Sequence, residues 1–215
     1  ELALAEGLVA RFAPARESAD AEDLAQRFAF VHDRVQQSAY ALIPAPRRAF
    51  VHLAVGRLLR GRTTPQQLDA EIFDIAHHLN LGRDLIRERA ERLEVAALNL
   101  VAGQRAKAAT AQVSALELFE AGLAMLDAKA WEEEPTLSFE LHFEASQSHC
   151  LCGSFAAAEQ HLVELSAHAR TRIDRARIAR QRSVQLENQG HYAQALATTR
   201  EGLALVGVSI PDTPA

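Results

Sequence analysis

An internal repeat of helical segments is the feature of this sequence that most limits its fold. The segment GSFAAAEQHLVEL begins at Gly153, and a similar segment, GHYAQALATTREGLAL, begins 37 residues later at Gly190. Both contain glycine, any residue, an aromatic residue, two more residues and alanine. A third copy, QVSALELFEAGLAM, begins at Gln112. Repetition at such a period is typical of folds in which each unit packs mainly on its neighbours.

The residues between the copies predict partner helices. Glycine occurs only 10 times in 215 residues and aromatic residues make up 6%, which favours helix. Apolar residues recur with the 3.6-residue period of a helix, as at 68–79 and 93–101. We expect first helices at 91–107, 136–152 and 171–189, each followed by a tight turn and a second helix. One such pair cannot bury its apolar stripe alone, so pairs must stack.

The sequence therefore predicts an all-α fold with a helical-hairpin solenoid, and the pattern resembles degenerate tetratricopeptide (TPR) repeats. The alternative is an irregular helical bundle, which is also all-α. The expected organisation is the end of a first domain at 1–45, connecting helices at 46–90, about three helix pairs at 91–210 and a tail at 211–215. In TTPQQL, Thr64 is expected to cap a helix that has Pro65 in its first turn.

A strand and a helix are predicted near the N-terminus. Residues 27–31, RFAFV, have strand character, and one strand among helices indicates a small hairpin of a domain that lies partly outside this chain. Asp33 is expected to be the N-cap of the next helix, and Pro44 to follow its end. The buried stripe of this helix is expected to consist of Val35, Ala39, Leu42 and Ile43. The neighbours His32 and Asp33 are thus interpreted as structural rather than reactive.

Charge and composition exclude several classes of function. The net charge of -5 and the pI near 6.0 argue against nucleic-acid binding, which needs a basic surface. No apolar run approaches the roughly 20 residues that span a bilayer, so no membrane insertion is expected. Cys150 and Cys152 point to opposite sides of an expected helix and do not favour a disulfide, which is typical of a reduced, cytoplasmic protein. The start at Glu1 and the single methionine, Met125, indicate a piece of a longer protein.

No catalytic residue and no metal or cofactor site is predicted. The sequence lacks the phosphate-binding loop G-x-x-x-x-G-K-[ST] and the zinc motif H-E-x-x-H. The nearest approach to a metal site is SHCLC, in which His149 and Cys152 share a helix face and His142 could add a third ligand. A structural zinc site needs four ligands, so we interpret the cysteines as buried residues beside the turn at Gly153.

Two arginine-rich groups stand out. One is the stretch 170–182, RTRIDRARIARQR. The other consists of Arg47, Arg48, Arg57, Arg60 and Arg62. A nucleic-acid surface would add interleaved aromatic residues for stacking, and the stretch 170–182 lacks them. We interpret these arginines as solvated faces and as ion pairs between repeats.

The leading hypothesis is a non-enzymatic module that binds a protein or peptide, because stacked helix pairs present an extended surface. The polar residues expected to be exposed on this surface and to contact the partner are Asn99, Gln104, Arg105, Gln147, Arg182, Gln185 and Asn188. The alternative is a small-molecule receptor with a pocket lined by Phe139, Phe143 and Phe155. The end faces of such an array could also join two copies in a homo-oligomer.

Three segments carry a resemblance to a known family. They are FAFVHDRVQQSAYALIPAPRRAFVHLAVGRLL, EIFDIAHHLNLG and ERLEVAALNLVAGQRAKAATAQVSALELFEAGLAML. In order and spacing they resemble signalling ATPases of the STAND type, above all the multi-sensor hybrid histidine kinases and serine/threonine kinase fusions with a predictive-ATPase module. The resemblance covers 24–205.

This resemblance implies a longer protein in which separate domains bind the nucleotide and sense the signal. The first 45 residues would complete a winged-helix domain, and a core that binds ATP and Mg²⁺ would lie upstream. The helical repeats would act as a sensor or scaffold that docks on this core, which makes the core a partner. DNA binding by the winged helix would need that domain to be complete, so it is not expected here.

Overall fold

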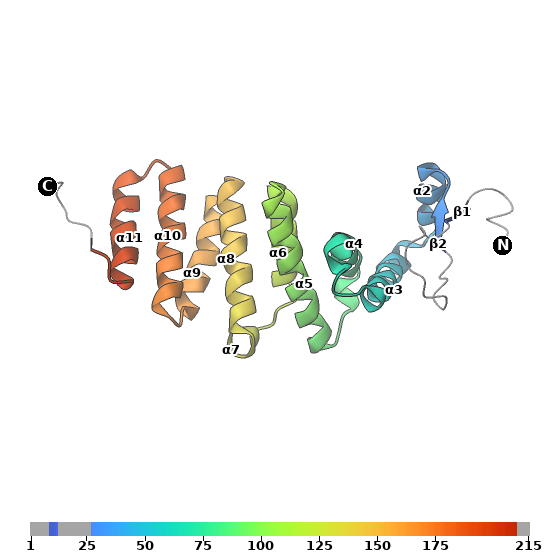
Figure 1. Cartoon of the computed structure of the whole chain (residues 1–215), viewed down its shortest axis with the longest axis horizontal. Coiled ribbons are helices and arrows are strands. Elements are labelled where there is room, and N and C mark those ends of the chain that lie inside the picture. Colours follow the sequence, from blue (N-terminus) through green and yellow to red (C-terminus); the bar gives the residue numbers. More distant parts are fainter. Residues whose placement is uncertain (1–8, 13–26, 210–215) are drawn as a thin grey trace. The chain divides into compact units, whose positions relative to one another are not determined.

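The structure of the protein is a computed structural model that describes residues 9–12 and 27–209. The chain divides into two compact units, Glu1–Phe50 and Val51–Ala215. Helices dominate, so the predicted all-α class is confirmed, with one two-stranded ribbon in the N-terminal unit (Figure 1). None of the described helices is long and apolar enough to cross a bilayer. The tail expected at 211–215 lies outside the described residues.

The N-terminal unit contains a β-ribbon that leads into a helix. β1 (Val9–Phe12) and β2 (Arg27–Phe30) are antiparallel, with Val9 opposite Phe30 and Phe12 opposite Arg27. The predicted strand is therefore present, and its partner strand comes from this chain. β2 is followed by α2 (Asp33–Ala41), and α3 (Ala45–Arg62) begins directly after Pro44.

Two expectations about α2 are wrong. Its N-cap is His32, whose side chain makes no capping hydrogen bond, and Asp33 is already inside the helix. In the first turn the carboxylate of Asp33 still lies near the positive end of the helix dipole. Within the part of the chain that the structure describes, no residue of α2 is buried, and Leu42 beyond its end is 83% exposed. The described residues therefore do not cover the apolar stripe of this helix.

The second unit is a succession of helices in which neighbours along the chain pack on one another. After the remainder of α3, its elements are α4 (Leu68–Leu81), the 3-10 turn η1 (Arg83–Leu85), α5 (Arg89–Ala108), α6 (Gln112–Leu123), α7 (Ala130–Glu133), α8 (Pro135–Leu151), α9 (Phe155–His168), α10 (Arg172–Asn188) and α11 (Tyr192–Leu205). The expected first helices are thus present as α5, α8 and α10. Each packs most closely on the helix that follows it, α6, α9 and α11, and α6 also packs on α8 (Figure 1).

The start of α4 differs from the prediction. The helix begins at Leu68 with Gln67 as its N-cap, so Thr64 is not the cap. The backbone carbonyl of Thr64 accepts from the N–H groups of Gln67 and Leu68, both at 3.0 Å, which forms a separate turn ahead of the helix. The side chain of Gln67 in turn accepts from the N–H of Thr64 at 3.2 Å. The proline at 65 lies in this turn.

One type of turn joins the two helices of each pair. Gly153 and Gly190 have φ angles of 77° and 79°, in the left-handed region that glycine enters without steric cost. Thr110 takes the same place after α5, with φ of 61°. After each of these residues, the next N–H donates to the carbonyl five residues earlier, at 2.9 Å after Thr110 and at 2.8 Å in the other two turns. This bond satisfies a helix-terminal carbonyl, so the three turns are equivalent in geometry, although the first has threonine where the other two have glycine.

Two clusters of buried side chains hold the second unit together. The larger lies among α3, α4, α5, α6 and α8, and Phe119 in it is 0% exposed. The smaller cluster consists of Phe139, Phe143, Leu162, Leu165 and Ile178, from α8, α9 and α10. The first helices α5, α8 and α10 therefore each contribute buried side chains to at least one of the two clusters.

A capping box at the start of α10 gives a prediction for stability. Thr171 Oγ1 accepts from the N–H of Asp174 at 3.0 Å, and the carboxylate of Asp174 accepts from the N–H of Thr171 at 2.9 Å. Thr171→Ala is expected to lower the free energy of unfolding by about 1 kcal/mol, because one helix N–H loses its acceptor. Urea denaturation measures the change. Ser154→Ala is the control, since this N-cap of α9 makes no side-chain capping bond and should cost less.

Candidate functional site

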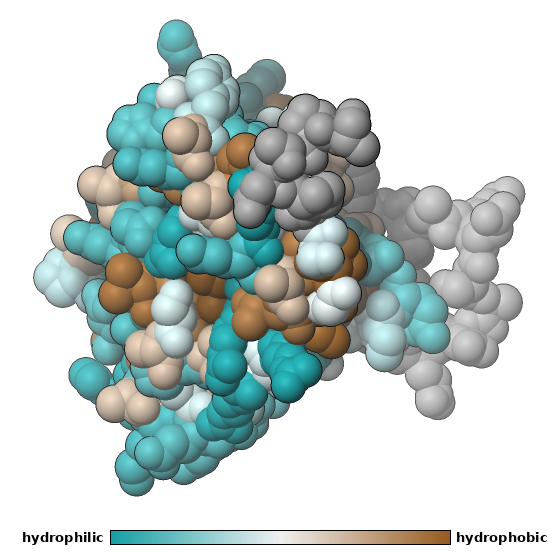
Figure 2. All heavy atoms as spheres, turned by 90° about the vertical axis from the view of Figure 1, so that its left-hand side faces the viewer, coloured by the Kyte–Doolittle hydropathy of each residue, from teal (hydrophilic) through white to brown (hydrophobic). Residues whose placement is uncertain are grey.

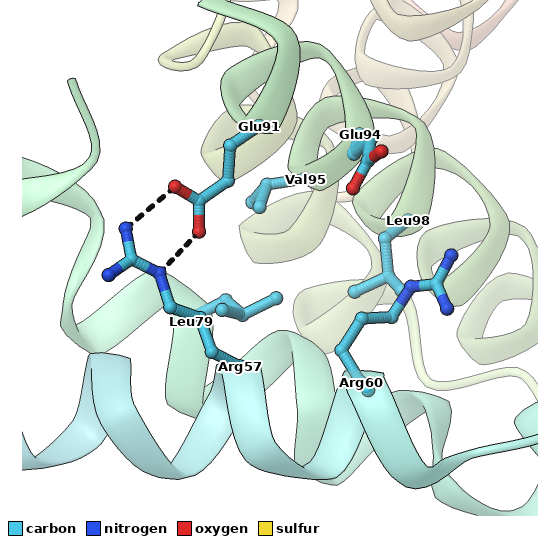
Figure 3. A pocket seen from close by; sticks show the side chains of 8 residues that line it. Arg57, Arg60, Leu79, Glu91, Glu94, Val95 and Leu98 are labelled. Atoms are coloured by element: carbon cyan, nitrogen blue, oxygen red, sulfur yellow. Dashed lines mark hydrogen bonds and ion pairs between the residues drawn. The ribbon is translucent and has the colours of Figure 1, made fainter. Parts of the chain in front are cut away.

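A pocket lies where α3, α4 and α5 meet in the second unit. Its volume is about 280 Å³, and its lining consists of Arg57, Arg60, Gly61, Leu79, Glu91, Glu94, Val95 and Leu98. Figure 3 shows apolar side chains at its centre, Leu79 and Val95 among them, with Arg57 and Glu91 at one side and Arg60 at the other. A pocket with an apolar centre and charged edges suits an apolar side chain of another polypeptide that has charged residues next to it.

The local sequence explains how the walls of this pocket form. Glu91, Val95 and Leu98 are four and three residues apart on α5, so they share one face of that helix. On the opposite side, Gly56 of α3 is buried against α4, and a Cβ at this position would lie 2.8 Å from Leu79 Cδ2. The absence of a side chain at Gly56 therefore allows α3 and α4 to approach and holds Leu79 in place at the pocket.

An ion pair fixes one edge of the pocket. Arg57 Nε donates to Glu91 Oε1 at 2.6 Å, and Nη2 donates to Oε2 at 2.7 Å. The hydrogen bond from Arg57 lowers the pKa of Glu91, and the same bond raises the pKa of Arg57. Both groups are therefore charged throughout the neutral pH range. The Arg57 side chain is 52% exposed, so solvent screens the pair, and its main effect is to orient the two groups.

The structure places the first three predicted partner residues in different surroundings. Asn99 is 0% exposed, so the prediction that it is exposed is wrong. Its side chain exchanges hydrogen bonds with Asn80 of α4, at 2.7 and 2.9 Å, and joins two helices. Gln104 is exposed and Arg105 is half-buried, and they bond to acidic residues of α8 and α4 respectively.

Of the other four predicted residues, Gln147 lies on α8 and the remaining three on α10. Gln185 is 5% exposed, so for this residue too the expected exposure is wrong. Arg182 donates to Glu159 of α9 at 2.9 Å, and Gln185 donates to the same carboxylate at 3.4 Å. Gln147 accepts from a lysine of α5, and Asn188 is exposed at the end of α10. The role of the residues that keep exposed surface stays a prediction.

Sequence reasoning missed the side-chain pairs that join α5, α8 and α10. Lys107 Nζ donates to Glu144 at 2.6 Å. Arg177 donates to both carboxylate oxygens of Glu140, at 2.6 and 2.8 Å, and its guanidinium lies 4.3 Å from the centroid of the Phe143 ring. One signal for this face exists in the sequence, since Glu140 and Glu144 are four apart on a helix. The general interpretation of arginines as ion pairs between repeats is confirmed for Arg177.

The metal ligands considered from the sequence do not come together. Among the described residues, no metal-binding group contains both His149 and Cys152. Both cysteines are free, and only Cys150 is buried, so the expectation that Cys152 is buried as well is wrong. Instead, His149 of α8 meets Glu120 of α6 and His161 of α9. Spacing along the chain could not link these residues, because they lie in three different helices.

The phenylalanines proposed as a ligand pocket are mainly core residues. Phe139 and Phe143 are each 7% exposed, and their rings are stacked with centroids 5.9 Å apart. They pack against the apolar side chains of α9 and α10 in the smaller core cluster. Phe155 lies apart from that cluster, as the first residue of α9. These three residues therefore do not form one cavity.

The chain is similar to a curated signalling protein. A protein of Dictyostelium discoideum described as "Hybrid signal transduction histidine kinase G" is 29% identical over 160 residues, an alignment that covers 63% of this chain. The same alignment covers 5% of the relative, so the chain spans about a twentieth of its length. No protein-family model matches the chain, and no solved structure gives a significant match. The similarity is thus distant and partial, and it points to a role in signalling.

Proposed function

We propose that this chain is a non-catalytic interaction module of a larger signal-transduction protein, and that its α3–α4–α5 pocket receives an apolar side chain of a protein partner. The observation that carries the proposal is the apolar centre of the pocket between charged edges. Its volume of about 280 Å³ lies just below the roughly 300–1,000 Å³ of small-molecule sites, which favours one side chain of a docked peptide or domain. The similarity to a hybrid histidine kinase supports the signalling context.

We further propose that the helix pairs from α5 to α11 are TPR-like repeats of a solenoid. The support is the recurrence of one turn geometry after α5, α8 and α10, together with the packing of each pair on the next. The segment 1–45 is proposed to end a winged-helix domain, with the ribbon of β1 and β2 followed by α2 as support. The helices at 46–90 then connect it to the repeats at 91–210.

The proposed mechanism is reversible docking on an ATPase core in the same cytoplasmic protein. That core, which belongs to the STAND type, would bind ATP and Mg²⁺ and would lie upstream of this chain. A ligand that prefers the undocked form shifts the population toward signalling. A shift from mostly docked to mostly undocked needs a differential affinity of about 10⁴-fold, or about 5.5 kcal/mol. Several side-chain contacts at the pocket and along the helix array would have to change together to supply it.

Charge reversal at the edge of the pocket tests this function. Arg60→Glu is expected to weaken binding to the ATPase core at least about tenfold, or by about 1.4 kcal/mol. The reason is that a negative side chain would replace a positive one at the edge of the pocket that the partner contacts. Arg60 is exposed, so the substitution should leave stability nearly unchanged. Isothermal titration calorimetry of the chain with the polypeptide that precedes it, first with ADP and then with an ATP analogue, gives the affinity in each state.

The control is Arg175→Glu, the same charge reversal at an exposed position of α10 outside the pocket. Nucleotide-dependent binding that Arg60→Glu weakens and Arg175→Glu does not would support docking through the pocket. Equal effects of the two substitutions would argue against the pocket. Absence of binding with either nucleotide would contradict regulation by docking on the ATPase core.

A second candidate function is a small-molecule receptor, and one observation favours it. A pocket of about 470 Å³ lies between α10 and α11, with apolar side chains of Ile173, Val184, Leu203 and Val206 in its lining. Its volume falls within the range of ligand sites. A thermal-shift screen against metabolites separates the two functions. A ligand of this pocket would raise the Tm without any protein partner, and a Val184→Glu substitution would abolish the shift.

A further inference from the structure

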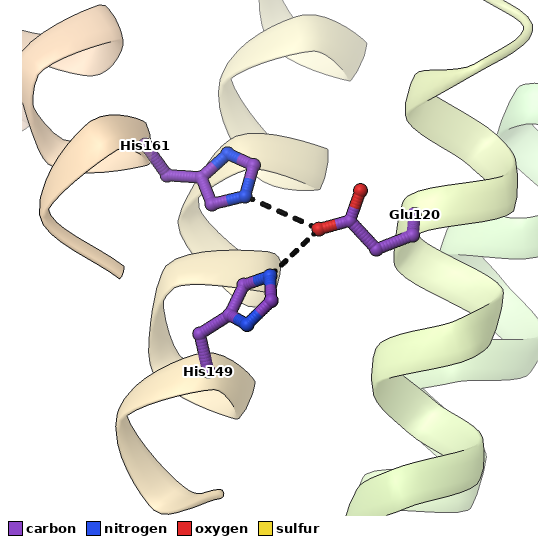
Figure 4. A group of neighbouring side chains, drawn as sticks. All are labelled: Glu120, His149 and His161. Atoms are coloured by element: carbon purple, nitrogen blue, oxygen red, sulfur yellow. Dashed lines mark hydrogen bonds and ion pairs between the residues drawn. The ribbon is translucent and has the colours of Figure 1, made fainter. Parts of the chain in front are cut away.

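Three side chains from three helices converge on one point in the second unit (Figure 4). Nε2 of His149 lies 2.7 Å from Glu120 Oε1, and Nε2 of His161 lies 3.3 Å from the same oxygen. The helices are α6 for Glu120, α8 for His149 and α9 for His161. One ligand atom of each residue lies within 4.8 Å of the other two. The three residues are therefore close enough together for a single ion to contact all of them.

We propose that Glu120, His149 and His161 form a binding site for one divalent transition-metal ion, with Zn²⁺ as the preferred ion. Two imidazole nitrogens and one carboxylate oxygen are a ligand set that zinc binds with three protein ligands and one open position. The mixture of nitrogen and oxygen disfavours Ca²⁺ and Mg²⁺, which take oxygen ligands. This inference does not depend on the proposed function in signalling.

The two separations that involve Glu120 fit an ion with small adjustments. In a tetrahedral site with bonds of about 2.0–2.1 Å, neighbouring ligand atoms are about 3.3 Å apart. The separation of His161 Nε2 from Glu120 Oε1 already has this value, 3.3 Å. The 2.7 Å hydrogen bond from His149 would have to lengthen by about 0.6 Å, which a rotation of the exposed Glu120 side chain accomplishes.

A further histidine orients one of the ligands. Nδ1 of His161 lies 3.0 Å from Nδ1 of His142, on α8. Binding of an ion at Nε2 of His161 would place the proton of this ring on Nδ1, which then donates to Nδ1 of His142. With its proton on Nδ1, His161 has on Nε2 the lone pair that an ion would bind in place of the present contact with Glu120. A ligand histidine whose other nitrogen donates to a fixed partner is typical of metal sites.

The orienting ring of His142 is itself held in place. It stacks on Trp131, with ring centroids 5.2 Å apart, and Trp131 Nε1 donates to Glu164 at 3.0 Å. His149 lacks a comparable support, because its Nδ1 is buried without a hydrogen bond among the described residues. His161 is therefore the better-oriented of the two histidine ligands, and its removal should have the larger effect on affinity.

Charge and access at the site also suit a cation. The carboxylate of Glu120 presents one oxygen, Oε1, to the imidazole nitrogens of both histidines. Its side chain is 45% exposed, whereas those of His149 and His161 are each 15% exposed. An ion would enter from the side of Glu120 and would keep a water molecule on that side. Bound there, it would clamp α6 of one helix pair to α8 and α9 of the next.

The test is metal titration of the whole chain. After treatment with EDTA and dialysis at pH 7.5, calorimetry with ZnCl₂ is expected to give one ion per chain. At Zn²⁺ concentrations about 100 times Kd, the Tm is expected to rise by about 5–10 °C. Glu120→Gln keeps the size of the side chain and removes the charge. It and His161→Ala are each expected to weaken binding at least about 100-fold, and His142→Ala about 10–100-fold through loss of orientation.

Two further variants make the result decisive. Cys152→Ser removes an exposed thiol near His149, and His191→Ala removes an exposed histidine outside the cluster. Both are expected to leave the affinity for Zn²⁺ unchanged, and circular dichroism checks that every variant is folded. Lack of saturable binding would overturn the proposal. Binding that survives in Glu120→Gln but disappears in Cys152→Ser would overturn it as well, because the ion would then use the SHCLC segment.

Discussion

Phe119→Ala is expected to lower the free energy of unfolding of the second unit by about 3–5 kcal/mol, the typical cost of removing a phenylalanine ring from a core. Phe119 is 0% exposed and lies in the larger cluster, between α5, α6 and their neighbours. Its ring fills the space opposite Gly103, where a Cβ would lie 2.4 Å from Phe119 Cε1. The alanine variant would leave a cavity beside Gly103, between α5 and α6.

The measurement is urea denaturation followed by the fluorescence of Trp131. This residue is the only tryptophan and lies in the second unit, so its signal reports on that unit alone. The matched control is Phe73→Ala, since Phe73 of α4 is 45% exposed and its removal should cost less than about 1 kcal/mol. Equal costs for the two variants would mean that α5 and α6 are not packed around Phe119 as described.

The helices of the second unit could be predicted because their signals are local. The period of apolar residues marked α4 and α5, the segments between the repeat copies marked α8 and α10, and the glycines at 153 and 190 marked the turns. The turn after α5 was harder to see, because Thr110 adopts a positive φ angle without being glycine. For β1 the four residues VARF carry too little alternation to indicate a strand, and the ribbon depends on a segment 15 residues further along the chain.

Burial and side-chain contacts between helices could not be predicted in this way. Asn99 and Gln185 are polar residues on amphipathic helices, and a single sequence gives no reason to place them inside. The amide of Asn99 has its partner in Asn80 of α4. Gln185 donates to Glu159 of α9, and its Oε1 is buried without a hydrogen bond among the described residues. The cluster of Glu120, His149 and His161 has the same origin, since each ligand comes from a different helix. Spacing rules act within one helix, and therefore they proposed Cys152 beside His149 instead.

Asn99→Ala is expected to lower the free energy of unfolding by about 2–3 kcal/mol, because it removes a buried group that has three hydrogen bonds. Nδ2 of Asn99 donates to Asn80 Oδ1 and to the carbonyl of Val95, both at 2.9 Å, and Oδ1 accepts from Asn80 at 2.7 Å. The alanine leaves the inner side of the Asn80 amide without its partner. The Trp131 denaturation assay gives the change in stability.

Asn188→Ala is the matched control, because Asn188 is exposed and, among the described residues, its side chain donates only to Cys150 Sγ, a weak acceptor, at 3.4 Å. Its cost should stay within about 0.5 kcal/mol. The two variants also separate structure from recognition. Since Asn99 links α4 to α5, the two helices that supply Leu79 and Val95 to the pocket, its loss should weaken partner binding only through a looser pocket. If Asn99→Ala left the free energy of unfolding unchanged but strongly weakened partner binding, Asn99 would contact the partner directly. Because Asn99 is buried, α4 and α5 would then have to separate when the partner binds.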